Sequence, residues 1–277
     1  MVVITTSIQN THPIPEMYVF GDSLSDTGTV FKATGGMYPP NPPYFQGRYS
    51  NGQVWVEYLA DFLYLSVAQT KNFAYGGATT GSDRNSYVPG LLAQIELFMQ
   101  TQQQLDPKAL YVIWAGANDY LQGERTATLP VENITKVIAF LADRGAKKLL
   151  VGNLPDLGQL PTTRTQANSA SLSALTQAHN QSLRRSLKVL SQQYSELQLA
   201  TLDANTLYRE AIANPATFGF TNVINACLTG AGTTTPDKSL FWDGIHPTTA
   251  AHRVLGETAF SALNAAGMVN LDSVLLG

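Results

Sequence analysis

Short apolar segments alternate with helix-length segments along most of the chain, and this alternation restricts the fold more than any other feature. Strands that alternate with helices in this way form βαβ units, in which a parallel sheet is covered by helices on both faces. The pattern therefore predicts one α/β domain over residues 1–277, with residues 1–16 as an N-terminal extension. The expected strands begin at Tyr18 and cover 109–115, 147–155 and 197–203, with a shorter one within 65–74; the expected helices cover 53–62, 91–104, 131–144, 167–194 and 205–213 and begin again at Pro247.

The composition excludes several classes of partner and site. Charged residues make up 13% of the chain, against about 25% in an average globular protein. The net charge is −3 and lysine and arginine do not cluster, so we expect no nucleic-acid partner. No uninterrupted apolar run reaches about 18 residues, so we expect no stable membrane insertion. A single cysteine, Cys227, excludes an intramolecular disulfide and a cysteine-based metal site.

The first 16 residues contain no basic segment followed by an apolar one, the pattern that is typical of a secretory signal peptide. As written, the chain is therefore expected in the cytoplasm. A chain from which a leader had been removed would look the same, so export stays open. The oligomeric state also stays open at this point.

Polar, glycine-containing turns follow several of the expected strands. Ser23 lies in a Gly-Asp-Ser turn directly after the first strand, and Asn118 follows the strand at 109–115. Parallel strands bring the loops at their carboxyl ends together, which is where α/β sheets bind their ligands. Acyl transfer by a serine needs a base, a group that orients the base, and donors for the oxyanion. The sequence must therefore supply these partners in other loops.

Histidine is the usual base, and the chain has four. His12 lies in a proline-flanked tail, and His179 lies within a long helix, where we expect it on the surface. His252 lies inside the last helix. His246 lies in the turn before that helix, three residues after Asp243, and is the best candidate for a base. On spacing alone, a capping aspartate beside a loop histidine is an equally good interpretation.

Two further turns could supply oxyanion donors. Gly76 and Gly77 allow a backbone N–H to approach a ligand closely, because glycine has no side chain. Asn118 offers a side-chain amide. Taken singly, a plain turn and an Asx-turn are the alternative interpretations.

These residues fall in four motifs that resemble those of GDSL-type esterases/lipases of the SGNH hydrolase superfamily. The resemblance extends from about residue 18 to 263. A further segment, GRYSNGQVWVEYLA at 47–60, resembles the one that follows the first motif in plant and microbial members. The four motifs occur in family order as FGDSLSDTG with Ser23, NFAYGGATTG with Gly77, GANDY with Gly116 and Asn118, and DGIHPT with Asp243 and His246.

The resemblance implies a role for each matched residue. Ser23 would be the nucleophile, His246 the general base and then acid, and Asp243 the residue that orients His246. The oxyanion hole would combine the Ser23 N–H, the Gly77 N–H and the Asn118 side chain, with Gly76 as the alternative to Gly77. The implied fold is a three-layer α/β/α sandwich, flavodoxin-like, with about five parallel strands.

The predicted function is hydrolysis of carboxylic esters through an acyl-enzyme, without a metal or an organic cofactor. Tyr44, Phe45, Tyr120 and Trp242 lie in or beside the loops around Ser23 and predict an apolar acyl or aryl pocket, although they could equally pack the loops down. We expect short- to medium-chain acyl or aryl esters, with lipids also compatible.

Four alternatives remain at this point. The same residues could serve a carbohydrate O-deacetylase or a lysophospholipase. A non-catalytic binding protein could keep the scaffold. A metal-dependent phosphoesterase is another alternative, because several residues near the expected site have oxygen or nitrogen donors. These potential ligands are Asp22, Asp26, Asn118, Asp119, Asp243 and His246.

Overall fold

The computed structural model describes residues 14–82, 87–102, 104–228 and 235–269. Nearly all of the expected N-terminal extension, including His12, lies outside the described residues. Within these ranges no helix combines the length and the apolar character needed to cross a bilayer.

Five parallel strands form one sheet in the order β2-β1-β3-β4-β5. The first strand in the chain is therefore flanked by the second and the third, which is the flavodoxin-like order. This confirms the predicted α/β class. The strands are β1 (Met17–Gly21), β2 (Thr70–Asn72), β3 (Leu110–Trp114), β4 (Lys148–Gly152) and β5 (Gln198–Leu202).

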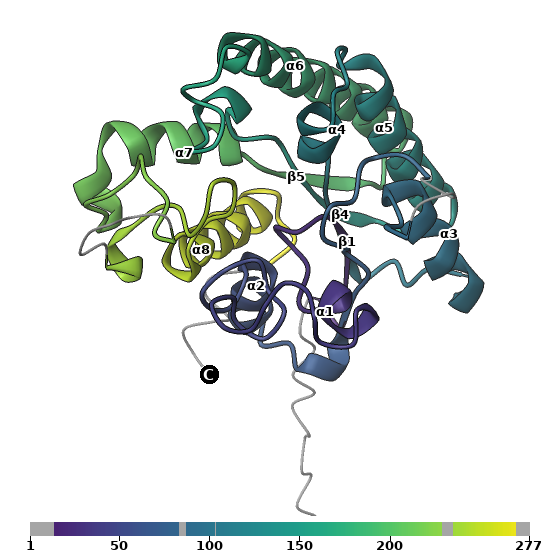
Figure 1. Cartoon of the computed structure of the whole chain (residues 1–277). Coiled ribbons are helices and arrows are strands. Elements are labelled where there is room, and N and C mark those ends of the chain that lie inside the picture. Colours follow the sequence, from purple (N-terminus) through teal and green to yellow (C-terminus); the bar gives the residue numbers. More distant parts are fainter. Residues whose placement is uncertain (1–13, 83–86, 103, 229–234, 270–277) are drawn as a thin grey trace, which may run out of the picture.

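Helices cover both faces of the sheet (Figure 1). Successive residues of a strand point to opposite faces, and the two cores follow this alternation. Val19 and Val112 pack on the side of α2 and α8, whereas Tyr18 and Tyr111 pack on the side of α3, α5 and α6. The α-helices are α1 (Thr29–Ala33), α2 (Trp55–Phe62), α3 (Leu91–Thr101), α4 (Ala117–Leu121), α5 (Thr128–Asp143), α6 (Ser169–Gln193), α7 (Ala204–Ala213) and α8 (Thr249–Ala265).

The last helix begins two residues later than predicted. Pro247 does not start it but forms an isolated antiparallel bridge with Phe241. Thr248 caps the helix instead, because its hydroxyl accepts the backbone N–H of Ala251 at 3.2 Å. His246 therefore stays in irregular backbone ahead of α8.

The strand order fixes which loops meet. β1 pairs with both β2 and β3, so the loops after these three strands lie at the same edge of the sheet. Ser23 follows β1, Gly76 and Gly77 follow β2, and Gly116 precedes α4 after β3. The three turns singled out in the sequence therefore converge.

Candidate active site

Ser23, His246 and Asp243 form a chain of short hydrogen bonds. His246 Nε2 lies 2.8 Å from Ser23 Oγ, and His246 Nδ1 lies 2.7 Å from Asp243 Oδ2. Ser23 is 8% exposed, and the His246 and Asp243 side chains are 13% and 16% exposed. The three side chains are thus shielded but reachable from solvent, in the order that serine activation needs.

The turn 242–247 fixes the Asp243 carboxylate with two of its own backbone N–H groups. Asp243 Oδ1 accepts the backbone N–H groups of Ile245 and His246 at 2.8 and 2.7 Å. Burial by itself would raise the pKa of Asp243. The hydrogen bonds and the charge of His246, together with the two N–H groups, outweigh burial and lower this pKa to about 2. Asp243 is therefore ionised at neutral pH.

Three donors next to Ser23 are free to bind an oxyanion. Neither the Ser23 N–H nor the Gly77 N–H has a hydrogen-bond partner among the described residues. Gly76 differs, because its N–H is bonded to Asp26 Oδ2 at 2.9 Å. Asn118 Nδ2 uses one hydrogen on the Ala78 carbonyl at 3.0 Å and keeps the other. Of the two glycines, Gly77 has the available N–H.

Side-chain bonds tie the Gly77 turn to the Asn118 turn. Asp119 accepts the Thr80 hydroxyl at 2.6 Å and the Thr80 N–H at 3.0 Å. Gln122 donates to the Gly77 carbonyl at 3.2 Å. Asp119 was expected only as a potential metal ligand, and its bond to Thr80 depends on the approach of two turns that are distant in sequence. The two turns are thereby held together as one unit.

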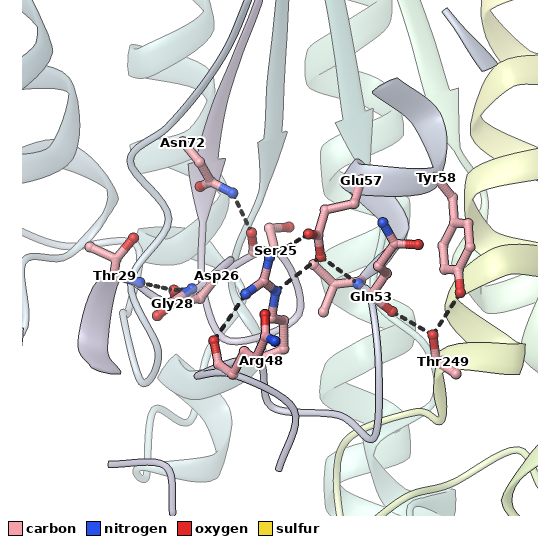
Figure 2. A network of polar contacts seen from close by, with 12 residues as sticks. Ser25, Asp26, Gly28, Thr29, Arg48, Gln53, Glu57, Tyr58, Asn72 and Thr249 are labelled. Carbon is pink, nitrogen blue, oxygen red and sulfur yellow. Dashed lines mark hydrogen bonds and ion pairs between the residues drawn. The ribbon is translucent and has the colours of Figure 1, made fainter. Parts of the chain in front are cut away.

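A second network holds the Ser23 loop against its surroundings (Figure 2). Asp26 accepts backbone N–H groups from Gly28 and Thr29, as well as from Gly76. The Asn72 amide at the end of β2 donates to the Ser25 carbonyl at 2.7 Å. The part of the loop that follows Ser23 is therefore fixed to both neighbouring turns and to the end of β2.

Asp22, directly before the nucleophile candidate Ser23, is a further buried carboxyl in this loop. It is 2% exposed and accepts one backbone N–H, from Leu24 at 3.0 Å. Burial has the largest effect on the pKa of Asp22 and raises it to about 7. The Leu24 N–H and the charge of His246 lower this pKa by less. Nearby Asp119 adds a further raising effect.

The potential metal ligands of the phosphoesterase alternative have other partners. Asp26 binds backbone N–H groups and Asp119 binds Thr80, while Asp243 and His246 bind each other. Within the ranges that the structure describes, no group of three or more His, Cys, Asp or Glu side chains is arranged to hold a metal ion.

None of the four residues expected to form an acyl pocket lines the hollow beside Ser23. Tyr44 donates to Asp243, and Tyr120 is buried with its hydroxyl 2.8 Å from His179 Nδ1. Phe45 lies under the Arg48 guanidinium at 5.7 Å, and Trp242 is buried beneath the turn. A narrow hollow beside Ser23 is lined instead by apolar side chains from α4, α7 and several loops. They are Leu121, Pro155, Leu157, Leu160, Tyr208 and Ile245.

The expected surface position of His179 is wrong. His179 is fully buried, because it belongs to the apolar stripe of α6 that includes Thr176 and Leu183. Burial lowers its pKa to about 4, so it is neutral. His252 is also buried, and its Nδ1 accepts the Trp55 N–H at 3.2 Å where α2 begins. Neither histidine contacts Ser23 in the described structure.

Comparison with known proteins agrees with this geometry. The family model for GDSL-like lipase/acylhydrolase matches residues 17–259. The chain is 29% identical to a phosphatidylcholine-sterol acyltransferase of Aeromonas hydrophila, over 94% of this chain and 93% of that protein. It is 26% identical to the GDSL esterase/lipase APG of Arabidopsis thaliana, over 87% and 89% of the two chains.

A solved structure also shares the fold. The crystal structure of a member of the lipolytic G-D-S-L family from Veillonella parvula aligns with a TM-score of 0.53 at 18% identity, covering 90% of this chain and 98% of that one. The matched residues contain the Ser23, Asn118 and His246 motifs. The chain therefore belongs to the GDSL-like lipase/acylhydrolase family.

Proposed function

We propose that this protein hydrolyses carboxylic esters with Ser23 as the nucleophile. The observation that carries the proposal is the hydrogen-bond chain from Ser23 Oγ through His246 to Asp243, with distances of 2.8 and 2.7 Å. The unpartnered N–H groups beside Ser23 support it, because they can stabilise the oxyanion.

In this mechanism, Ser23 Oγ attacks the ester carbonyl carbon while His246 Nε2 takes the serine proton. The carbonyl oxygen becomes an oxyanion and binds the Ser23 and Gly77 N–H groups and the Asn118 amide. His246 then protonates the departing alcohol, which leaves an acyl-enzyme on Ser23. Water, deprotonated by His246, repeats these steps and releases the carboxylic acid with the serine proton restored. Asp243 compensates the charge of His246 each time it is protonated.

The narrow hollow beside Ser23 supports a short or medium acyl chain as the substrate group. Its lining is apolar, with Leu157, Leu160 and Ile245 among its walls, and Ser23 and Asn118 lie at its border. An apolar hollow next to a nucleophile favours burial of the acyl part of an ester.

Hydrolysis of p-nitrophenyl esters from acetate to palmitate tests the proposal. We expect activity that peaks at a short or medium chain, resists EDTA and falls by at least about 10³-fold in Ser23→Ala. Ser191→Ala is the matched control, because Ser191 is exposed on α6 and far along the chain from the site. EDTA-sensitive activity, or full activity in Ser23→Ala, would contradict the proposal.

Acyl transfer to an alcohol is a second candidate, supported by the 29% identity with the Aeromonas acyltransferase over nearly both full chains. The same acyl-enzyme would then be attacked by an alcohol in place of water. Adding a long-chain alcohol or a sterol to the assay distinguishes the two. Formation of a new ester at the expense of free acid supports transfer, whereas an unchanged yield of acid supports hydrolysis alone.

A further inference from the structure

Tyr44 reaches the proposed catalytic site from a loop that the four sequence motifs do not include. Its hydroxyl lies 2.8 Å from Asp243 Oδ2, although the two residues are 199 positions apart in the chain. This is the same carboxylate oxygen that lies 2.7 Å from His246 Nδ1. Tyr44 and His246 therefore share one acceptor atom.

The pKa values of Asp243 and Tyr44 show which of the two groups donates the hydrogen bond. The pKa of Asp243 is lowered to about 2, so its carboxylate is ionised and only accepts. Burial, followed by the negative charge of Asp243, raises the pKa of the Tyr44 hydroxyl above its ordinary value. Tyr44 thus stays protonated and donates a hydrogen bond to Oδ2. This bond is stronger than one between neutral groups, because its acceptor is charged.

Several contacts hold the Tyr44 loop in this place. The Ser50 hydroxyl donates to the Pro247 carbonyl at 2.9 Å, next to His246. The Phe45 N–H donates to the Ser50 carbonyl at 2.9 Å, which closes the loop on itself. The Tyr49 ring packs with its centroid 5.1 Å from that of His246. The loop therefore contacts both the carboxylate and the imidazole.

An ion pair anchors the far side of the same loop. Arg48 Nη2 lies 2.6 Å from Glu57 Oε1 on α2, and Arg48 Nη1 donates to the Gln46 carbonyl (Figure 2). Both side chains are less than one-fifth exposed. Tyr49 lies between these anchors and Tyr44 directly precedes the first of them, so the positions of both rings depend on the protein framework and need no bound substrate.

We propose that Tyr44 is a positioning residue that fixes Asp243 Oδ2 and limits how strongly this oxygen binds the His246 imidazole. Four donors surround the carboxylate: Ile245 and His246 N–H on Oδ1, and Tyr44 and His246 Nδ1 on Oδ2. Without the Tyr44 donor, Oδ2 would be held by His246 alone, and the position of this oxygen would be less tightly fixed. The inference rests on the proposed function of Ser23, His246 and Asp243.

Tyr44→Phe tests the inference with almost no change in side-chain volume. We expect kcat on a p-nitrophenyl ester to fall about tenfold, as for loss of a hydrogen bond to a charged group, with KM unchanged. Tyr38→Phe is the matched control: Tyr38 lies in the same loop, is 55% exposed and has no hydrogen bond from its hydroxyl within the described structure. It should retain wild-type kcat and KM.

A spectroscopic readout separates positioning from general loss of structure. The proton between His246 Nδ1 and Asp243 should give a low-field ¹H NMR resonance, which Asp243→Asn would remove. In Tyr44→Phe this resonance should move further downfield, because Oδ2 loses its competing donor and binds His246 more tightly. In Tyr38→Phe it should not move.

Two results would overturn the inference. An unmoved resonance with wild-type kcat would show that the Tyr44 bond has no effect on Asp243. A raised KM with unchanged kcat would make Tyr44 a substrate-binding side chain instead. Failure of the proposed function is distinguishable from both, because Ser23→Ala would then keep its activity whatever the outcome in Tyr44→Phe.

Discussion

Asp22 and Asp243 are buried carboxyls at one site, yet their environments move their pKa values in opposite directions. Burial raises the pKa of Asp22 to about 7, because the hydrogen bond from the Leu24 N–H only partly offsets it. Asp243 is also buried, but two N–H groups, Tyr44 and His246 surround it, and its pKa falls to about 2. At Asp243 the hydrogen bonds and the charge of His246 outweigh burial, whereas at Asp22 burial outweighs the smaller effects of its neighbours.

Replacement of Asp22 by Asn should therefore stabilise the protein at high pH. The pKa of Asp22 is about 7 in the folded state and about 3.9 in an unfolded chain. The folded state binds more protons between these values, so wild-type stability falls as pH rises from 4 towards 7. The Asp22→Asn variant has no carboxyl at this position, so its stability does not fall with pH for this reason. Its free energy of unfolding should exceed that of wild type by a few kcal/mol at pH 8, at about 1.4 kcal/mol per pH unit.

Guanidinium denaturation at pH 5 and pH 8 measures the effect. The difference between Asp22→Asn and wild type should be small at pH 5 and larger at pH 8. An equal difference at both pH values would show that the carboxyl of Asp22 does not change its protonation on folding in this range.

At the scale of elements, the loop 34–53 links α2 to the turn before α8. Arg48 binds Glu57 in α2, and Glu57 Oε2 accepts the Val54 N–H at 2.9 Å where α2 begins. Ser50 binds Pro247 on the opposite side. The Thr249 hydroxyl in α8 is hydrogen-bonded to the Tyr58 hydroxyl and donates to the Gln53 carbonyl (Figure 2). A loop rich in proline and glycine is thereby held in one conformation.

Arg48→Met should reduce both activity and stability. It removes the ion pair that anchors the loop, and loss of one partner of a largely buried pair costs up to about 3 kcal/mol. The Tyr44 and Tyr49 contacts with the site would then be less well fixed, so we expect kcat to fall several-fold. Arg253→Met is the control, because Arg253 pairs with Glu257 on the exposed face of α8. Equal loss of kcat in both variants would argue against a specific role of the loop.

Much of the architecture was predictable because each strand and its following turn are local in sequence. The apolar run before Ser23 and the run at 109–115 both became central strands, and the convergence of their loops follows from parallel pairing. The Tyr44–Asp243 bond was not predictable, because nothing local in the sequence brings together residues 199 positions apart. The lining of the hollow was not predictable for the same reason, because it comes from helices and loops that are far apart in the sequence.

The burial of His179 could have been predicted from the sequence. Buried residues of α6 recur every three or four positions, and His179 lies on that stripe between Thr176 and Leu183. A polar residue on an apolar stripe needs a partner, which the sequence alone did not identify. Tyr120 supplies it from α4, next to the Asn118 turn.

For the whole molecule, the buried neutral histidines predict a loss of stability in acid. The pKa of His179 is lowered to about 4 and that of His252 to about 3, both by burial. The unfolded chain binds protons at histidine from about pH 6.5 downward, whereas the folded protein does not. The stability that these groups contribute is present above pH 6.5 and is lost as pH falls towards 4.

His179→Gln isolates one of the two contributions. Glutamine can still accept the Tyr120 hydroxyl but cannot gain a proton. The free energy of unfolding of His179→Gln should therefore decrease less than that of wild type between pH 7.5 and pH 5. Denaturation curves at the two pH values measure both changes. Parallel decreases in the two proteins would mean that His179 is not the group that titrates.

The most direct test of the central claim is covalent labelling by a fluorophosphonate, read by intact-mass and peptide mass spectrometry. Labelling should give one adduct per molecule, located on Ser23, with none in Ser23→Ala and much slower formation in His246→Asn. An adduct on another residue, or no adduct in a preparation that hydrolyses esters, would contradict the assignment of Ser23 as the nucleophile.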